Sequence, residues 1–398
     1  MNPLMILLNI LGVLLLLATL PLTVELLLLS VAAALPPRPA RARATTNFRL
    51  AVIVPAHNEE KLIATCVNSL LSDRETPVEV FVVAHNCTDR TAEFATQAGA
   101  RVLPLDGAGG KGLALDHGFH HALELGADAV LVIDADSVVS KNLLAVVVGA
   151  IRAGADAVQT RYQVANVDTN FRTRLSALAL LGMNVLRPRG RSRLGLSCGI
   201  FGNGFALSAS TLARVPYTAN SLVEDLEYHL RLVQAGIRVE FLDNATVFGE
   251  MPEKSAAAGT QRARWEGGRT LMRRQWTARL LKGVFRGTRR LIEPLLDLLA
   301  LPLALQTILL LVALAIPITW LRIYGVAGLV LVILYVVVAA SLSSDPADAL
   351  RALAAAPGYL LWKLLMIPST RLASRKNAAW VRTQRNAEAA PAKTDSTD

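Results

Sequence analysis

The chain has 398 residues, 53% of them hydrophobic, and it carries a formal net charge of +10. This apolar content is high for a soluble protein and is concentrated at both ends, which indicates membrane segments flanking one soluble domain. The sequence contains no nucleic-acid-binding motif, and its three cysteines show no metal or disulfide pattern, so we expect the basic residues to meet anionic lipid and substrate phosphates.

Residues 1–37 are expected to form an N-terminal transmembrane helix. The segment is almost wholly apolar, with Pro21 and Glu25 as interruptions, and roughly 20 apolar residues suffice to span a bilayer. It is too long for a cleaved signal peptide and lacks a basic start. Three arginines between positions 38 and 43 place the soluble domain after them in the cytoplasm by the positive-inside rule. Two short spans in place of one helix are the alternative.

Residues 48–260 have the pattern of an α/β domain. Short apolar runs at 50–54, 78–84, 101–104 and 130–133 alternate with helical segments. Strands that alternate with helices in this way predict right-handed crossovers and a mostly parallel, Rossmann-like sheet. Ligands of such sheets bind at the carboxyl ends of the strands.

Pro55 and six polar or charged side chains follow these four strands at the expected ligand-binding edge. In chain order they are Pro55, Asn58, Glu59, Asp89, Lys111, Asp134 and Asp136. The hard oxygen atoms of the last two suit Mg²⁺ or Mn²⁺ bound to a diphosphate. Residues two apart on a regular strand point to opposite faces, so both carboxylates reach one ligand only if the backbone turns there. A solvated turn is the plain alternative.

The second half of the domain places two carboxylates at a helix start. We expect a helix over 171–186, a basic loop over 187–194 and a tight turn at 202–204. Glu224 and Asp225 then open a helix, where a carboxylate in a partly dry cleft can serve as a general base. The alternative is that the two acids only stabilise the positive end of the helix.

Residues 261–292 begin with the motif QRARW and continue with arginines interleaved with apolar side chains. This composition predicts amphipathic helices that lie at the membrane surface.

Two further transmembrane helices are expected within residues 293–343, one over 295–320 and the other over 323–341. Residues 344–398 predict an interfacial segment around 354–367, followed by a basic and then polar cytoplasmic tail.

Five of these motifs resemble those of the membrane-bound, inverting glycosyltransferases of family 2, which have the GT-A fold and include cellulose, chitin, hyaluronan and poly-N-acetylglucosamine synthases. In the family's order they are Pro55-Ala56-His57-Asn58-Glu59, Asp89, Asp134-Ala135-Asp136, Glu224-Asp225 and Gln261-Arg262-Ala263-Arg264-Trp265. The resemblance covers roughly residues 50–290 and extends to the flanking spans. Each motif alone is a weak sign, whereas five in the right order are specific.

The resemblance implies roles residue by residue. The nucleotide-sugar side would comprise Pro55, Asn58, Glu59, Asp89, Lys111, Asp134 and Asp136, with Asp136 as the ligand of Mg²⁺ or Mn²⁺. Asp225 would be the general base, and the acceptor and diphosphate side would comprise Gly204, Glu224, Gln261, Arg264 and Trp265. The plain alternatives are a helix cap for Asp89, a solvated loop lysine for Lys111 and an interfacial tryptophan for Trp265.

These expectations combine into a metal-dependent, inverting hexosyltransferase that moves a sugar from a UDP-sugar to a growing exopolysaccharide, at the cytoplasmic face of a bacterial inner or plasma membrane. The alternative acceptor is a single lipid of the ceramide or diacylglycerol type, because about three spans are few for a polymer channel. A polymer route would require a homo-oligomer or a secretion partner. A membrane-anchored nucleotide-binding module without turnover is the remote alternative.

Overall fold

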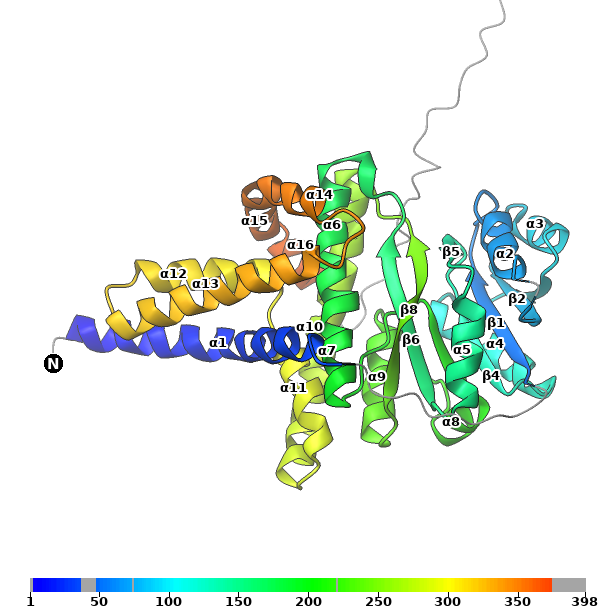
Figure 1. The fold of residues 1–398 in the computed structure, drawn as a ribbon, viewed down its shortest axis with the longest axis horizontal. Coiled ribbons are helices and arrows are strands. Elements are labelled where there is room, and N and C mark those ends of the chain that lie inside the picture. The colour runs from blue at the N-terminus through cyan, green and yellow to red at the C-terminus, as the bar shows by residue number, and fades with distance from the viewer. Residues whose placement is uncertain (1–2, 37–47, 74, 220, 374–398) are drawn as a thin grey trace, which may run out of the picture.

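The protein is described by a computed structural model over residues 3–36, 48–73, 75–219 and 221–373. The arginines between 38 and 43, and the polar tail from residue 374, lie outside the described residues. An α/β domain stands at one end of the molecule, and a stem of long apolar helices projects from it (Figure 1). Helices α6 (Phe171–Leu181) and α7 (Arg187–Leu194) lie between the sheet and the stem.

The domain is built on one mixed sheet of eight strands in the order β3-β2-β1-β4-β7-β6-β8-β5. The strands are β1 (Leu50–Ala56), β2 (Val78–His85), β3 (Arg101–Leu105), β4 (Ala129–Val132), β5 (Ser137–Val139), β6 (Ala157–Val164), β7 (Phe205–Ser208) and β8 (Val239–Gly249). Strands β1 to β4 pair in parallel, whereas β7 is antiparallel to both of its neighbours. The predicted α/β fold with a parallel half is therefore confirmed.

Both faces of the sheet are buried, which explains the unbroken apolar runs of its strands. Along β1, Ile53 joins one core with Phe81 and Phe119, while Val52 joins the opposite core with Leu131. The remaining helices of the domain are α2 (Ile63–Leu71), α3 (Thr91–Gln97), α4 (Lys111–Glu124), α5 (Leu143–Arg152), α8 (Ala209–Arg214) and α9 (Glu224–Gln234). The first core continues through α6 to the base of the stem, so domain and stem share one apolar interior.

The segment expected as a basic loop at 187–194 is helical, and that prediction is wrong. It forms α7, which continues α6 through a π-helical turn at Gly182–Leu186. Pro188, which cannot donate to the helical hydrogen-bond ladder, lies just after this π-helical turn, where the regular ladder is interrupted. Arg187 and Arg191 are buried and pair with acids from distant segments, so their charge does not require a solvated loop.

The basic segment after the domain is one helix, α10 (Ser255–Phe285), followed by α11 (Ile292–Leu299). Its apolar residues Met272, Trp276 and Leu280 are buried against α9 and α11. The protein itself therefore covers these three apolar side chains, and the position of the helix at the membrane surface stays a prediction. Only the end of the helix exposes large apolar side chains, with Phe285 at 86% exposure.

The stem consists of α1 (Pro3–Ala33), α12 (Leu303–Ala315) and α13 (Thr319–Ala340), which run side by side (Figure 1). Among the described residues, α1 and α13 are long and apolar enough to cross a membrane. The expected span over 295–320 is not one straight helix, because the segments Arg289–Leu299 and Leu303–Ala315 meet at 76°. Pro302 lies at this break and cannot continue the hydrogen-bond ladder of α11.

Three short helices close the described part of the chain. They are α14 (Pro346–Arg351), α15 (Ala356–Leu365) and α16 (Ile367–Ala373). Helix α15 covers most of the segment expected to be interfacial, and it packs near α10 through an ion pair between Lys363 and Glu266.

Candidate active site

The loops after β1 and β2 meet at the carboxyl edge of the sheet and hold each other. The amide oxygen Oδ1 of Asn58 accepts a hydrogen bond of 2.8 Å from the backbone N–H of Thr88. Asn58 has a φ of 55°, a left-handed conformation that asparagine tolerates better than most residues. The backbone N–H of Glu59 donates to the hydroxyl of Thr91 at 2.8 Å. The residues predicted for the nucleotide side therefore lie in two loops that are hydrogen-bonded to each other.

Asp89 is fixed at the centre of this connection. Its carboxylate accepts hydrogen bonds from the N–H and the hydroxyl of Thr91 at 3.0 and 2.5 Å, and from the N–H of Glu60 at 3.1 Å. Partial burial opposes ionisation, but the hydrogen bonds from Thr91 and Glu60 prevail and lower the pKa of Asp89. A rigid, ionised carboxylate thus stands beside the loop after β1. The helix-cap alternative is visible in the bond from the Thr91 N–H to Oδ1, while Oδ2 accepts the N–H of Glu60.

The backbone turns directly after β4, as the pair of carboxylates requires. Strand β4 ends at Val132 and β5 begins at Ser137, whose N–H donates to the carbonyl of Asp134 at 3.0 Å. The Ser137 hydroxyl donates to Asp136 at 3.3 Å. Among the described residues, no group of three or more His, Cys, Asp or Glu side chains is arranged to hold a metal ion. Two carboxylates on one turn fit an ion whose other ligands come from a diphosphate.

Lys111, the first residue of α4, reaches into this turn. Its ammonium forms an ion pair with Asp134 and donates to the carbonyl of Gly202 at 2.6 Å. Burial would lower the pKa of Lys111, but the negative charges of Asp134 and Glu224 outweigh it and raise that pKa. The lysine is therefore a fixed positive charge at the ligand edge, and the solvated-loop alternative does not describe it.

Glu224 and Asp225 begin α9 and face the same turn across Gly202. A methyl group at Gly202 would lie 3.2 Å from Oδ2 of Asp225 and 3.7 Å from Nζ of Lys111. Burial and the neighbouring Asp225 raise the pKa of Glu224 to about 7, and burial also raises the pKa of Asp225. A carboxyl group with a pKa near neutrality is suited to accept a proton from a hydroxyl.

Gly204 lies directly before β7 and is hydrogen-bonded to the neighbouring strands β4 and β6. Its carbonyl accepts a hydrogen bond of 2.8 Å from the N–H of Thr160, and a methyl group at this position would lie 2.4 Å from the Thr160 hydroxyl oxygen. Its φ of 71° also favours glycine. The structure thus gives Gly204 a supporting place beneath the carboxylates.

The QRARW segment lies in the first half of α10, with Gln261, Arg264 and Trp265 half-buried. Trp265 packs on an apolar cluster that includes Leu180 and Met251. Three residues further along the same helix, Gly268 approaches Val223 so closely that a methyl group on the glycine would lie 2.5 Å from Val223 Cγ1. Because Val223 immediately precedes Glu224, α10 is held against the start of α9.

Sequence reasoning did not identify Thr91 and Ser137, although both hydrogen-bond to predicted site carboxylates. Each hydroxyl residue stands one or two positions after an aspartate. That spacing is typical of turns in which a hydroxyl fixes a carboxylate, and it could have drawn attention to both residues.

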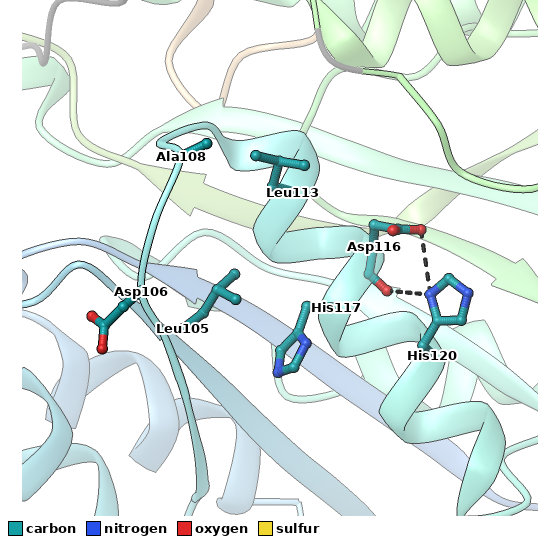
Figure 2. A pocket seen from close by; sticks show the side chains of 7 residues that line it. All are labelled: Leu105, Asp106, Ala108, Leu113, Asp116, His117 and His120. Carbon is teal, nitrogen blue, oxygen red and sulfur yellow. Dashed lines mark hydrogen bonds and ion pairs between the residues drawn. The ribbon is translucent and has the colours of Figure 1, made fainter.

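A pocket of about 270 Å³ lies beside this cluster, between the end of β3, the loop after it and α4 (Figure 2). It is lined by Leu105, Asp106, Ala108, Leu113, Asp116, His117 and His120. Nδ1 of His120 lies 3.4 Å from the Asp116 carboxylate and 2.8 Å from the Asp116 carbonyl oxygen, and both side chains form part of the wall. None of the predicted site residues lines this pocket, so the carboxylate cluster at the sheet edge remains the candidate site.

Comparison with known proteins identifies a match to the family model "Glycosyltransferase like family 2" over residues 48–268. The probable glycosyltransferase YdaM of Bacillus subtilis is 25% identical over 250 residues, which cover 59% of this chain and 58% of that protein. The beta-monoglucosyldiacylglycerol synthase of Nostoc sp. is 28% identical over 232 residues, covering 55% of this chain and 48% of that protein. The chain therefore spans less than two thirds of the length of either relative.

Among solved structures, the mannosyltransferase PcManGT from Pyrobaculum calidifontis, in complex with GDP-Man and Mn²⁺, has a similar fold. The TM-score is 0.53 at 18% sequence identity, and the match covers 92% of this chain and 97% of that one. At this identity the likeness concerns the fold, and it extends beyond the α/β domain because nearly the whole chain is included.

Proposed function

Because this chain belongs to the glycosyltransferase-like family 2, we propose that it transfers a sugar from a nucleotide-diphosphate donor to an acceptor carried in the membrane. The observation that carries the proposal is the arrangement around Gly202: the turn with Asp134 and Asp136 on one side, the ammonium of Lys111 beside it, and Asp225 opposite. Charges of both signs are thus placed where a diphosphate and an attacking hydroxyl can meet.

The donor would lie along the carboxyl edge of the sheet. Pro55, Asn58, Glu59 and Asp89 would hold the base and ribose, and Lys111 would bind the diphosphate. Asp136, with Asp134 beside it, would hold Mg²⁺ or Mn²⁺, which would neutralise the departing diphosphate as a Lewis acid. The fit rests on hard oxygen donors at one turn, and on the use of one or two carboxylates for such ions.

Asp225 would act as the general base. It would accept the proton of an acceptor hydroxyl while the oxygen attacks C1 of the sugar and the bond from C1 to the diphosphate oxygen breaks. Attack from the side opposite the leaving group inverts the configuration at C1. The raised pKa of Asp225 and of neighbouring Glu224 supports this role, and QRARW on α10 would border the acceptor and diphosphate side.

The packing of the stem favours a lipid acceptor. Leu310 of α12 fills the space beside Gly328 of α13, where a methyl group would lie 2.7 Å from it. The hydroxyl groups of Thr19 on α1 and Tyr324 on α13 are 2.7 Å apart. The described stem helices thus pack directly against one another, which favours a single lipid acceptor over passage of a growing sugar chain. The name of the Nostoc relative, beta-monoglucosyldiacylglycerol synthase, supports the same acceptor class.

The second candidate is synthesis of an exopolysaccharide, which the QRARW motif of α10 favours. It requires a passage formed by a homo-oligomer or by a secretion partner. A nucleotide-binding module without turnover is the remote candidate, and the joint presence of Asp136 and Asp225 argues against it. In all cases we propose an inner or plasma membrane location, with the α/β domain on the cytoplasmic side and no nucleic-acid partner.

A product assay tests the proposal. Purified protein in lipid vesicles receives Mn²⁺ and, in separate reactions, labelled UDP-glucose, UDP-N-acetylglucosamine or GDP-mannose. A single labelled species that partitions into organic solvent is the expected result. A ladder of labelled products of high molecular weight would show that the acceptor is a growing polymer and not a lipid. Nucleotide binding without release of nucleoside diphosphate would leave the binding module as the function.

A further inference from the structure

Six charged side chains, three of them buried and three partly buried, join four segments where the stem meets the domain, and we call them the ionic cluster. They are Glu25 of α1, Arg187 and Arg191 of α7, Arg269 of α10, and Glu293 and Asp297 of α11. Glu25 pairs with both arginines of α7, at 2.7 Å to Arg191. Asp297 pairs with the same two arginines at 2.6 and 2.7 Å, and with Arg269 at 3.0 Å.

The ionic cluster combines three arginines with three acids. Glu25 is 3% exposed and Arg191 is 5% exposed, so neither charge is compensated by water. Removing one member of such a set leaves a buried charge without its partner, and the surrounding helices must then shift or admit water. The relative placement of α1, α7, α10 and α11 therefore depends on all six groups.

A short chain of contacts leads from this cluster to the catalytic carboxylates. Arg269 is bound to Asp297 through both the carboxylate and the backbone carbonyl of that residue. The next residue toward QRARW is Gly268. It packs so closely on Val223 that a methyl group on the glycine would lie 2.5 Å from Val223 Cγ1. Val223 is followed by Glu224 and Asp225, the first residues of α9.

We propose that the ionic cluster positions the active site: it sets α10 against the start of α9 and ties that contact to α1. Glu25, Arg187 and Arg269 are thus positioning residues for Asp225. Helix α1, besides being a membrane segment, contributes to the placement of the active-site carboxylates. The inference rests on the proposed transferase function. It predicts that disturbing the cluster slows the chemical step more than it weakens donor binding, because the contact of Gly268 with Val223 leads to the start of α9 and not to the loops after β1 and β2.

The first experiment uses the full chain in lipid vesicles and follows UDP or GDP release from the donor that supports turnover. Glu25→Gln and Arg187→Gln are each expected to lower kcat roughly 10-fold or more, since small misplacements of a reacting group have large effects. The KM for the donor is expected to stay within about twofold. The double variant restores the balance of charge and should be more active than either single variant. Glu93→Gln, which removes an exposed ion pair with Arg90, is the control.

A second experiment leaves the ionic cluster intact and tests the contact that it sets. Gly268→Ala places a methyl group 2.5 Å from Val223, whereas Gly259→Ala on the same helix meets Met366 at an ordinary 3.6 Å. We expect Gly268→Ala to lower kcat with little change in donor KM, and Gly259→Ala to retain activity. The comparison of Gly268→Ala with Gly259→Ala tests the proposal even if a variant of the ionic cluster fails to fold.

The outcomes separate the two proposals. An active parent protein whose kcat is unchanged in Glu25→Gln and in Gly268→Ala overturns the positioning role and leaves the transferase proposal standing. Equal losses of donor affinity and kcat, together with a double variant no better than the singles, overturn it as well. A parent protein that releases no nucleoside diphosphate from any of the three donors overturns the transferase function itself.

Discussion

Lys111 and Asp134 form an ion pair that joins the start of α4 to the turn after β4. The same ammonium lies close to the two carboxylates at the start of α9, whose charges raise its pKa. One lysine thus balances three acids in the protein without its donor, and a diphosphate would bring further negative charge to the same place. The donor site and the candidate base are therefore coupled electrostatically through a single side chain.

Replacing Lys111 by methionine tests this coupling. Methionine keeps much of the length and removes the charge, so the diphosphate loses a counter-charge and the pKa of Glu224 rises further. We expect kcat/KM to fall roughly 10²-fold, a typical effect of removing one electrostatic contact to developing charge, and the rising limb of the pH–rate profile to move to higher pH. Steady-state kinetics between pH 6 and 9 measures both, and Lys111→Arg should retain most of the activity.

Replacing Asp225 tests the base. Asp225→Asn preserves shape and removes the proton acceptor, so turnover should fall about 10²–10⁴-fold while nucleotide affinity stays near that of the parent. Turnover and calorimetric binding of UDP provide the two readouts. Glu227→Gln on the same helix, which removes the charge that pairs with Arg231 and accepts from the Ser221 N–H, is the matched control. If Glu224→Gln abolished turnover and Asp225→Asn did not, the base would be the neighbouring glutamate.

Glu224 makes folding stability depend on pH. Its pKa is raised from 4.5 to about 7 in the folded protein, so between these values the folded state holds a proton that the unfolded chain has lost. The contribution of this group to stability is therefore complete below pH 4.5 and is lost as the pH rises through about 7. Thermal unfolding from pH 5 to 8 should show a falling midpoint, and Glu224→Gln should flatten the decline. An equal decline in both proteins would contradict the assignment.

Removal of divalent metal should abolish turnover. Excess EDTA is expected to stop the reaction, and Mn²⁺ or Mg²⁺ is expected to restore it. Asp136→Asn should raise the Mn²⁺ concentration needed for half-maximal activity about 10-fold or more, with a smaller effect for Asp116→Asn in the neighbouring pocket. Full activity of the parent protein in EDTA would show that the turn after β4 acts without a metal.

Thr91 links the two loops of the nucleotide side. Its buried hydroxyl donates to Asp89 and accepts from the N–H of Glu59. Thr91→Val keeps the volume but leaves that N–H without its acceptor, so unfolding free energy should drop about 1–3 kcal/mol and the donor KM should rise. Denaturant unfolding and donor kinetics check the two effects. Thr96→Val on the exposed side of the same helix, where the hydroxyl bonds only the Ala92 carbonyl, should change neither.

The strands in the first half of the domain could be predicted closely from sequence, because burial on both faces alone determines their sequence pattern. Strands such as β1 and β4 are buried on both faces, so their apolar runs are continuous and their ends are marked by polar residues. The positions of Asp89, Asp134 and Asp136 at one edge follow from parallel pairing. The spacing did not reveal which hydroxyl and amide groups fix those carboxylates, since these bonds form only when the loops meet.

The helix α7 was missed for a physical reason that lies outside its own segment. Read alone, 187–194 is polar around its whole circumference and has no apolar face to bury. Its arginines are buried because Glu25 and Asp297 supply their partners, and these lie 162 and 110 residues from Arg187 in the chain. A local pattern cannot report a partner at such a distance. The break at Pro302, by contrast, lies at a proline that is visible in the sequence. The expected single span over 295–320 followed from the length of the apolar run.

The ionic cluster also imposes an order on how the molecule is made. Synthesis proceeds from the N-terminus at about 5–20 residues per second, so Arg187, which follows Glu25 by 162 residues, is added roughly 8–30 s later. Asp297 comes another 110 residues after that. Until then α1 and the domain cannot be joined by their full set of charges. Helix α1 and most of the α/β domain therefore leave the ribosome before all six charged groups exist. Docking of α1 on the domain is a late step in the biogenesis of this enzyme.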